Sequence, residues 1–151
     1  MHRLTSVICG LTLGLGLVTA FAQPGEEGRN ELQGSWTAVK AIRDGKAAQG
    51  VVGNRLTFTG KRFRIQSKQG KRLYRGTFRA DASAKPASID FEHTEGVLEG
   101  KAWKGIYILD GDTLTVCDNA PDPDKGRPAA FAAKSGSGYV LITFKRVKPR
   151  S

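Results

Sequence analysis

The stretch Leu32-Gln33-Gly34-Ser35-Trp36 lies ten residues after a predicted export cleavage site and opens the first strand-like run of the chain. From Gly34 onward the chain consists of short runs of alternating apolar and polar residues, separated by turn signals. That pattern is typical of an all-β domain, whose first strand would contain Trp36. The stretch therefore predicts a fold class and a compartment, and it names neither a ligand nor a reaction.

Residues 1–22 have the pattern of a signal peptide. Positions 2 and 3 are His and Arg, residues 4–21 contain no acidic or basic side chain, and residues 20–22 read Ala-Phe-Ala. This pattern predicts cleavage after Ala22, which makes the mature chain secreted or periplasmic, without a transmembrane segment. An uncleaved membrane anchor is the alternative, because the apolar run approaches the length of a membrane span.

The processed chain has 129 residues, which suits one domain with a single core. It carries 23 basic and 14 acidic side chains, a formal net charge of +9. Cys117 is its one cysteine, so no internal disulfide can form and the core must hold the fold. We interpret Cys117 as a half-exposed small hydrophobe in a monomer, with an intermolecular disulfide as the alternative.

Eight strands are predicted in a domain that covers residues 32–148, after a flexible, polar lead-in at residues 23–31. No run has the 3.6-residue period of an amphipathic helix. Gly60-Lys61 and residues 68–71 have the composition of hairpin turns. The predicted strands cover residues 35–42, 54–59, 62–67, 72–79, 88–93, 104–109, 112–117 and 139–147.

Asp110-Gly111 is the clearest turn signal, because Asp-Gly suits the positive φ angles of a two-residue type I′ hairpin. Such a turn pairs Leu109 with Asp112. Tyr107 and Leu109 then share a face with the apolar residues of the next strand. The apolar pattern and the turn therefore agree.

One face of the predicted strands is apolar and the other is polar. Eight sequential antiparallel strands with this pattern predict an up-and-down barrel, whose closure removes exposed edges. The interior of an eight-stranded barrel is either filled by side chains or holds one small ligand, and the sequence leaves both open. Residues 118–138 break the pattern with a proline-rich loop, and residues 129–133 fit a short strand or one helical turn.

The chain resembles a family of uncharacterised secreted domains, found mostly in planctomycete bacteria, that look like lipocalin-type barrels. The resemblance spans nearly all of residues 32–147 and implies a fold and an exported location, with no established activity. The matching pieces are Leu32-Gln33-Gly34-x-Trp36, Leu56-Thr57-Phe58, Gly76-Thr77-Phe78, Lys85-Pro86 with Ile89-Asp90, residues 105–117, Gly126-Arg127-Pro128 with Phe131, and residues 134–138 leading to Arg146.

The same resemblance implies a structural role for Trp36 and Arg146. In a lipocalin-like barrel the tryptophan lies at the closed end, and an arginine late in the last strand stacks across it. Arg146 alternates with Phe144 and Ile142, so it points inward as this contact requires. A desolvated cation–π pair of this kind contributes about 2 kcal/mol.

The strongest charge feature is a basic face on three successive predicted strands. Residues 54–79 contain nine basic and no acidic side chains. Strand periodicity places five arginines outward, and these are the candidates for binding a polyanion: Arg55, Arg62, Arg64, Arg75 and Arg79. A solvated, solubilising face explains the same charges. Nucleic acid is weakly supported because the aromatic residues of these strands point inward.

No residue pattern supports catalysis or a metal or cofactor site, and we expect no enzymatic activity. Asp90 and Glu92 lie about 7 Å apart on one strand face, within the range of paired carboxylates, but an exposed face explains them better. Three aspartates between 118 and 124 lack the final glutamate of a calcium loop. His93 is the one histidine of the mature chain and cannot supply a ligand cluster alone.

The sequence favours an exported, lipocalin-like binding module whose expected ligand is a small apolar molecule. Six inward aromatic side chains would line a pocket if the barrel has one, and they are also the side chains that a filled core would contain. These pocket candidates are Phe63, Tyr74, Phe78, Phe91, Tyr107 and Phe144. The alternative is a surface or matrix protein that binds polyanions through the basic face.

Overall fold

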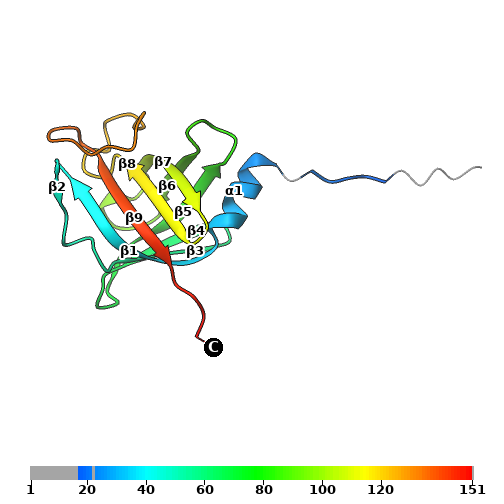
Figure 1. Ribbon diagram of the computed structural model, residues 1–151, viewed down its shortest axis with the longest axis horizontal. Helices are drawn as coiled ribbons and strands as arrows, with labels where there is room; N and C mark the ends of the chain where they lie inside the picture. Colours follow the sequence, from blue (N-terminus) through cyan, green and yellow to red (C-terminus); the bar gives the residue numbers. More distant parts are fainter. Residues whose placement is uncertain (1–16, 22, 151) are drawn as a thin grey trace, which may run out of the picture.

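The computed structural model describes residues 17–21 and 23–150, and its main feature is a closed barrel of eight antiparallel strands (Figure 1). Each predicted run matches one strand, and β9 pairs with β1 to close the barrel. The predicted signal peptide lies largely outside the described residues. The barrel strands are β1 (Gly34–Arg43), β3 (Arg55–Thr59), β4 (Arg62–Gln66), β5 (Arg72–Asp81), β6 (Ser88–His93), β7 (Ala102–Asp110), β8 (Thr113–Asp118) and β9 (Val140–Arg146). Two short elements, β2 (Lys46–Ala47) and the 3₁₀ helix η1 (Gly96–Leu98), lie outside the barrel wall.

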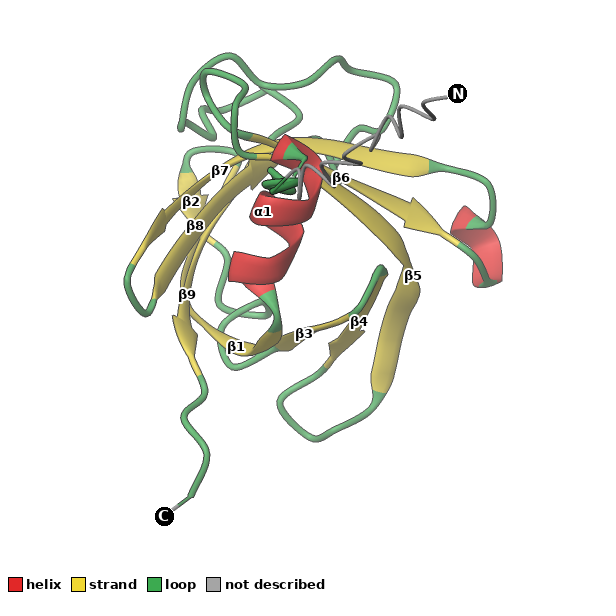
Figure 2. Ribbon diagram, turned by 90° about the vertical axis from the view of Figure 1, so that its right-hand side faces the viewer, coloured by secondary structure: helices red, strands yellow, loops and turns green. Residues whose placement is uncertain are grey.

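The expected flexible lead-in is instead helix α1 (Pro24–Leu32), which lies across one end of the barrel (Figure 2). Leu32 is fully buried, and a Cβ on Gly28 would lie 2.9 Å from the Tyr107 hydroxyl and 3.3 Å from Ala80 Cβ. The helix therefore docks through a glycine and one leucine. No hydrophobic stripe marks such a helix in the sequence, and the polar composition of residues 23–31 predicts a flexible lead-in instead.

The half of the barrel nearest α1 is filled by aromatic side chains. The rings of Phe58 and Phe78 lie 4.4 Å apart, and those of Phe63 and Phe91 meet edge to face at 5.0 Å. Gly76 makes room for this packing, since a Cβ there would lie 1.8 Å from the Glu92 carbonyl oxygen and 2.9 Å from the Phe63 ring. The predicted inward positions are confirmed, and here they form a solid core.

The predicted turn at residues 60–61 is confirmed, but the turn between β7 and β8 is not the one predicted. Asp110 pairs with Thr113, so Gly111 and Asp112 form the turn, and φ at Gly111 is +56°. A glycine at the first central position is typical of a type II′ turn. The predicted pairing of Leu109 with Asp112 is wrong by two residues. Because the shift is even, every side chain stays on the predicted face.

The segment between β8 and β9 contains neither helix nor strand, so residues 129–133 are neither of the two elements considered. Two side chains hold it against the barrel. The fully buried Asn119 accepts a 2.8 Å hydrogen bond from the Lys104 amide, and Arg127 donates a 2.7 Å hydrogen bond to the Gly105 carbonyl. The loop is therefore an ordered part of the wall.

Cys117 is fully buried, which corrects the expected half-exposed position. Its Sγ lies 3.5 Å from the Ala132 carbonyl oxygen, so the loop covers the thiol. Burial raises the pKa of this thiol. A side chain this inaccessible is a poor partner for an intermolecular disulfide.

Candidate functional site

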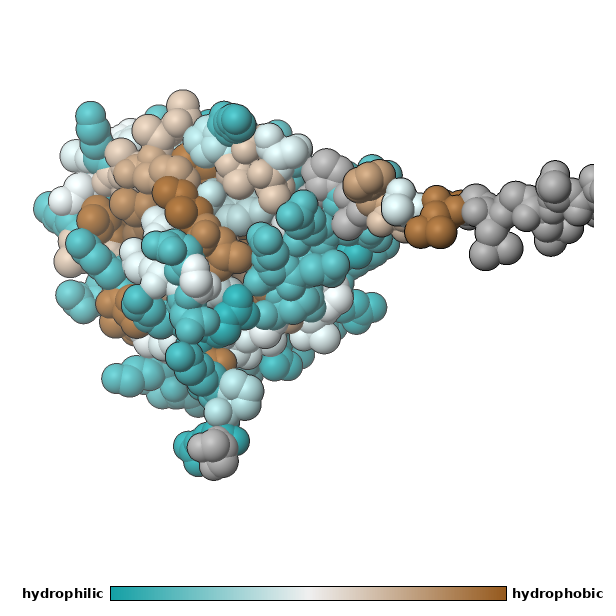
Figure 3. Space-filling view, turned by 45° about the vertical axis from the view of Figure 1, so that its right-hand side comes forward, coloured by the Kyte–Doolittle hydropathy of each residue, from teal (hydrophilic) through white to brown (hydrophobic). Residues whose placement is uncertain are grey.

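The barrel contains a cavity of about 220 Å³ at the end opposite α1. It lies between the last residues of β1, β4 and β8 and the first residues of β3, β5, β7 and β9, which all meet at this end. One face of the molecule shows apolar side chains gathered away from the N-terminal extension and hydrophilic ones nearer to it (Figure 3). The apolar wall includes Leu56, Ile65, Val116, Val140 and Ile142.

Three of the six predicted pocket residues line this cavity: Tyr74, Phe91 and Phe144. The other three, Phe63, Phe78 and Tyr107, belong to the filled core and do not line it. Tyr107 lies beneath α1, where burial raises the pKa of its hydroxyl to about 12. All six alternate correctly along their strands. Their position along the barrel axis alone decides which of them line the cavity and which belong to the filled core.

Trp103 and His93 form an aromatic cluster at the cavity wall together with Tyr74. The Trp103 ring lies 4.8 Å from the Tyr74 ring and 4.2 Å from the His93 ring. Trp103 lines the cavity, whereas the fully buried His93 lies behind it. Burial lowers the pKa of His93, so its ring is neutral at pH 7. Trp103 Nε1 and His93 Nε2 have no hydrogen-bond partner among the described residues.

Asp118 is the charged residue most deeply buried in the cavity wall, with 5% of its surface exposed. Its Oδ1 accepts a 2.9 Å hydrogen bond from the Ala120 amide. Burial raises the pKa of this carboxyl to about 6, although the Ala120 hydrogen bond and the charge of Arg43 lower it. At pH 7 the cavity therefore contains a carboxylate in a largely apolar wall.

Sequence reasoning missed Trp103, Asp118 and Arg43 as cavity residues. A signal for Asp118 was present, because it continues the inward alternation of Leu114 and Val116. We considered it only as part of a calcium loop. Among residues 17–21 and 23–150 no group of three or more metal-binding side chains occurs.

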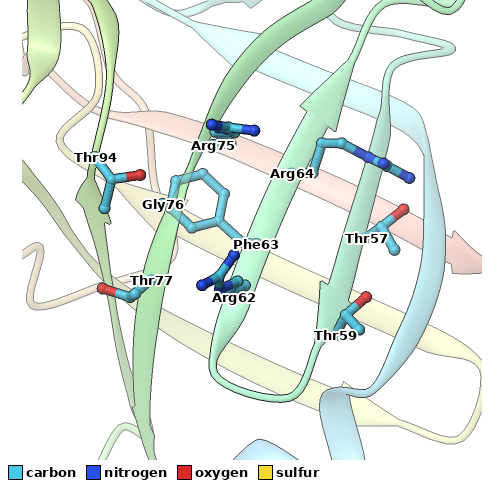
Figure 4. Close-up of a pocket in the computed structure, with 9 residues that line it drawn as sticks. All are labelled: Thr57, Thr59, Arg62, Phe63, Arg64, Arg75, Gly76, Thr77 and Thr94. Atoms are coloured by element: carbon cyan, nitrogen blue, oxygen red, sulfur yellow. The ribbon is translucent and has the colours of Figure 1, made fainter.

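A second hollow of about 490 Å³ lies on the outside of the barrel over β3, β4 and β5 (Figure 4). Its walls include Arg62, Arg64 and Arg75, with threonines between them. Strand pairing sets the positions of these side chains, since Arg64 is opposite Thr57 of β3 on one side and Arg75 of β5 on the other. All five predicted face arginines, Arg55, Arg62, Arg64, Arg75 and Arg79, are exposed.

The basic face is only partly neutralised by acidic residues. Glu95 pairs with Arg75 at 2.8 Å and with Arg72 at 3.3 Å. In the described part of the chain, no ion pair includes Arg55, Arg62, Arg64 or Arg79. The face therefore keeps unpaired positive charge on β3, β4 and β5.

The predicted contact at the closed end is present. Arg146 Cζ lies 4.1 Å from the centroid of the Trp36 ring. The guanidinium also donates to the Gln33 carbonyl at 2.8 Å and to the Glu31 carbonyl at 3.1 Å, and it pairs with Asp112 at 3.3 Å. Arg146 thus joins β9, the C-terminus of α1 and the β7–β8 turn, which is a structural role.

The two carboxylates considered for catalysis do not act as a pair. Asp90 forms a 2.7 Å ion pair with Arg127, whereas Glu92 lies exposed on the outer face. No helix within the described ranges is both long and apolar enough to cross a membrane.

Comparison with protein-family models, with curated proteins and with solved structures finds no significant match. The resemblance to the planctomycete domains therefore stays a prediction.

Proposed function

We propose that this protein is an exported binding module that holds a small, largely apolar molecule without chemically converting it. The binding site is the cavity at the end of the barrel opposite α1, which we call the open-end cavity. The observation that supports this most directly is the cavity itself, about 220 Å³ bounded mainly by aliphatic and aromatic side chains. A dry apolar cavity of about 150 Å³ is large enough to bind benzene. The volume therefore suits a ligand with a single ring and a short chain.

Propylbenzene is a suitable probe because its nine non-hydrogen atoms match that size. For a ligand of this size in a fitting pocket we expect a Kd on the order of 0.1 mM. Binding can be followed by calorimetry and by the fluorescence of Trp103, since the second tryptophan, Trp36, lies at the closed end.

Filling the cavity tests its identity as the binding site. Ile142→Phe adds a ring to the cavity wall, whereas Ile108→Phe adds the same ring to a side chain that is 49% exposed. We expect the Ile142 variant to lose propylbenzene binding and the Ile108 variant to keep it. Equal binding by both variants, or no binding by the unmodified protein, would contradict the proposal.

Export is supported by where the folded part begins. Helix α1 starts at Pro24, immediately after the expected cleavage point, so removal of residues 1–22 would leave every described helix and strand intact. The mass of the protein from its native cell envelope tests this point. A chain beginning at Gln23 is expected, and an intact Met1 chain would contradict export by cleavage.

A polyanion-binding face is the second candidate function, favoured by the hollow that Arg62, Arg64 and Arg75 line. Heparin-column retention tests it with Arg62→Glu, Arg64→Glu and Arg75→Glu combined. The control combines three charge reversals at other exposed positions: Lys40→Glu, Lys101→Glu and Lys104→Glu. Earlier elution of the first variant alone supports the face, and equal retention of both variants refutes it.

A further inference from the structure

The wall of the open-end cavity combines one buried carboxylate with a cluster of aromatic rings. Asp118 pairs with Gly105 of β7 on one side and with Val140 of β9 on the other. Neither neighbour carries a polar side chain. Trp103 lies two residues from Gly105 on the same face, so its side chain is a diagonal neighbour of Asp118.

Among the described residues, this carboxylate has no cationic partner within hydrogen-bonding distance. It accepts one hydrogen bond, from the Ala120 amide, and no ion pair in the described part of the chain includes it. Arg43 lines the same cavity but is exposed, and it is opposite Val140, two strands away from Asp118. A buried charge is costly without a partner, so a cation entering the cavity would supply what the protein lacks.

The aromatic side of the cavity suits the same kind of ligand. Tyr74 and Trp103 meet edge to face at 4.8 Å, and Phe91 is opposite Trp103 across the β6–β7 pair. Gly105 has no side chain to separate Trp103 from Asp118. Aromatic faces attract cations, most strongly where water is excluded. Trp103 and Phe91 are buried, whereas Tyr74 is 37% exposed and lies at the edge of the cavity.

We propose that the ligand of this cavity is a small protonated arylalkylamine, whose ammonium group binds the Asp118 carboxylate while its ring lies among Tyr74, Phe91 and Trp103. This inference rests on the proposed function, because it identifies the ligand class of the same cavity. The ammonium donates hydrogen bonds to the free lone pairs of Asp118. A neutral or anionic ligand would leave the buried carboxylate without a cation.

Three probes of similar size test the ligand class: 2-phenylethylamine, propylbenzene and the anion phenylacetate. In the unmodified protein at pH 7.5, the amine is expected to bind at least about tenfold more tightly than propylbenzene, and phenylacetate more weakly than either. Equal or weaker binding of the amine, with propylbenzene still bound, overturns this inference alone. Binding of none of the three overturns the proposed function as well.

Asp118→Asn provides the matched variant, because an asparagine Oδ1 can still accept the Ala120 hydrogen bond while the charge is removed. We expect the variant to lose the preference for the amine and to bind propylbenzene as before. An unchanged preference refutes the role of Asp118.

A measurement on the unmodified protein keeps the test independent of the variant's folding. Protonation of Asp118 between pH 7.5 and pH 4.5 should abolish the amine preference and leave propylbenzene binding unchanged. The charged and titratable groups near the carboxyl are Arg43 from β1, Tyr74 from β5, and His93 from β6, which lies beyond Trp103. The neighbouring strands β7 and β9 present Gly105 and Val140. A preference that persists at pH 4.5 contradicts the proposal.

Discussion

Replacing Arg146 by lysine should destabilise the closed end of the barrel while preserving its charge. The guanidinium makes four separate contacts: the Trp36 ring at 4.1 Å, two carbonyl oxygens at the end of α1 at 2.8 and 3.1 Å, and the Asp112 carboxylate at 3.3 Å. A single ammonium cannot reproduce the planar fork that reaches all of them. The variant therefore loses contacts of several kinds together.

The expected cost follows from those contacts. One lost hydrogen bond to a charged donor contributes about 1.5–3 kcal/mol. The partly exposed cation–π contact adds about 1 kcal/mol, and the half-exposed ion pair contributes little. With the ammonium keeping one hydrogen bond, Arg146→Lys should lower the free energy of unfolding by about 2.5–4 kcal/mol. For a domain of this size that corresponds to a fall in Tm of roughly 10–16 °C.

Urea unfolding and thermal melting at one ionic strength measure this loss, and hydrogen exchange of the α1 amides shows whether the helix undocks. Arg64→Lys on the outer face is the control and should change the stability by less than about 0.5 kcal/mol. A loss for Arg146→Lys as small as that of the control would refute the reasoning that this residue holds the barrel end together.

Three further outcomes are expected. Burial raises the pKa of Asp118 from 3.8 to about 6, so the folded state binds this proton more tightly than the unfolded state. The Asp118 contribution to stability should therefore fall by about 2.5 kcal/mol as pH rises from 4 to 7, and urea midpoints of Asp118→Asn should lack this pH dependence. Gly76→Ala should lower the free energy of unfolding by about 3 kcal/mol or more in thermal melts, since its Cβ would lie 1.8 Å from the Glu92 carbonyl oxygen. Gly126→Ala, in open space, should change stability little, and similar losses for the two variants would refute the steric argument. The buried thiol of Cys117 in the processed chain should react with iodoacetamide only after unfolding in urea, so rapid labelling of the native protein would show that the 118–138 loop opens.

Much of the barrel was predictable from local patterns. Each strand alternates because one side chain in two faces the core, and this period survives changes of register by an even number of residues. The turn at residues 60–61 was correct for the same local reason. At the turn that follows Asp110, the register was wrong by two residues, yet the inward positions were unaffected.

The candidate site was only half predictable. Phe63 and Phe91 alternate in the same way along their strands, but Phe63 packs against Gly76 in the core while Phe91 reaches the cavity. The difference lies in how far each side chain stands from the closed end. Strand pairing and barrel tilt set that height, and neither can be worked out from one strand alone.

The sequence by itself determined the strands, their inward faces and the basic outer face, because each depends on alternation or on a single residue type. The contact between Trp36 and Arg146 was what the lipocalin-like resemblance implied. The tertiary structure alone decided that residues 24–32 form a docked helix, that one half of the barrel is filled and the other hollow, and that Asp118 lies in the hollow half. Docking through Gly28 requires a partner surface, and a cavity is the volume left after all side chains pack. The docked helix and the cavity are both properties of the assembled barrel, and neither can be predicted from a single segment.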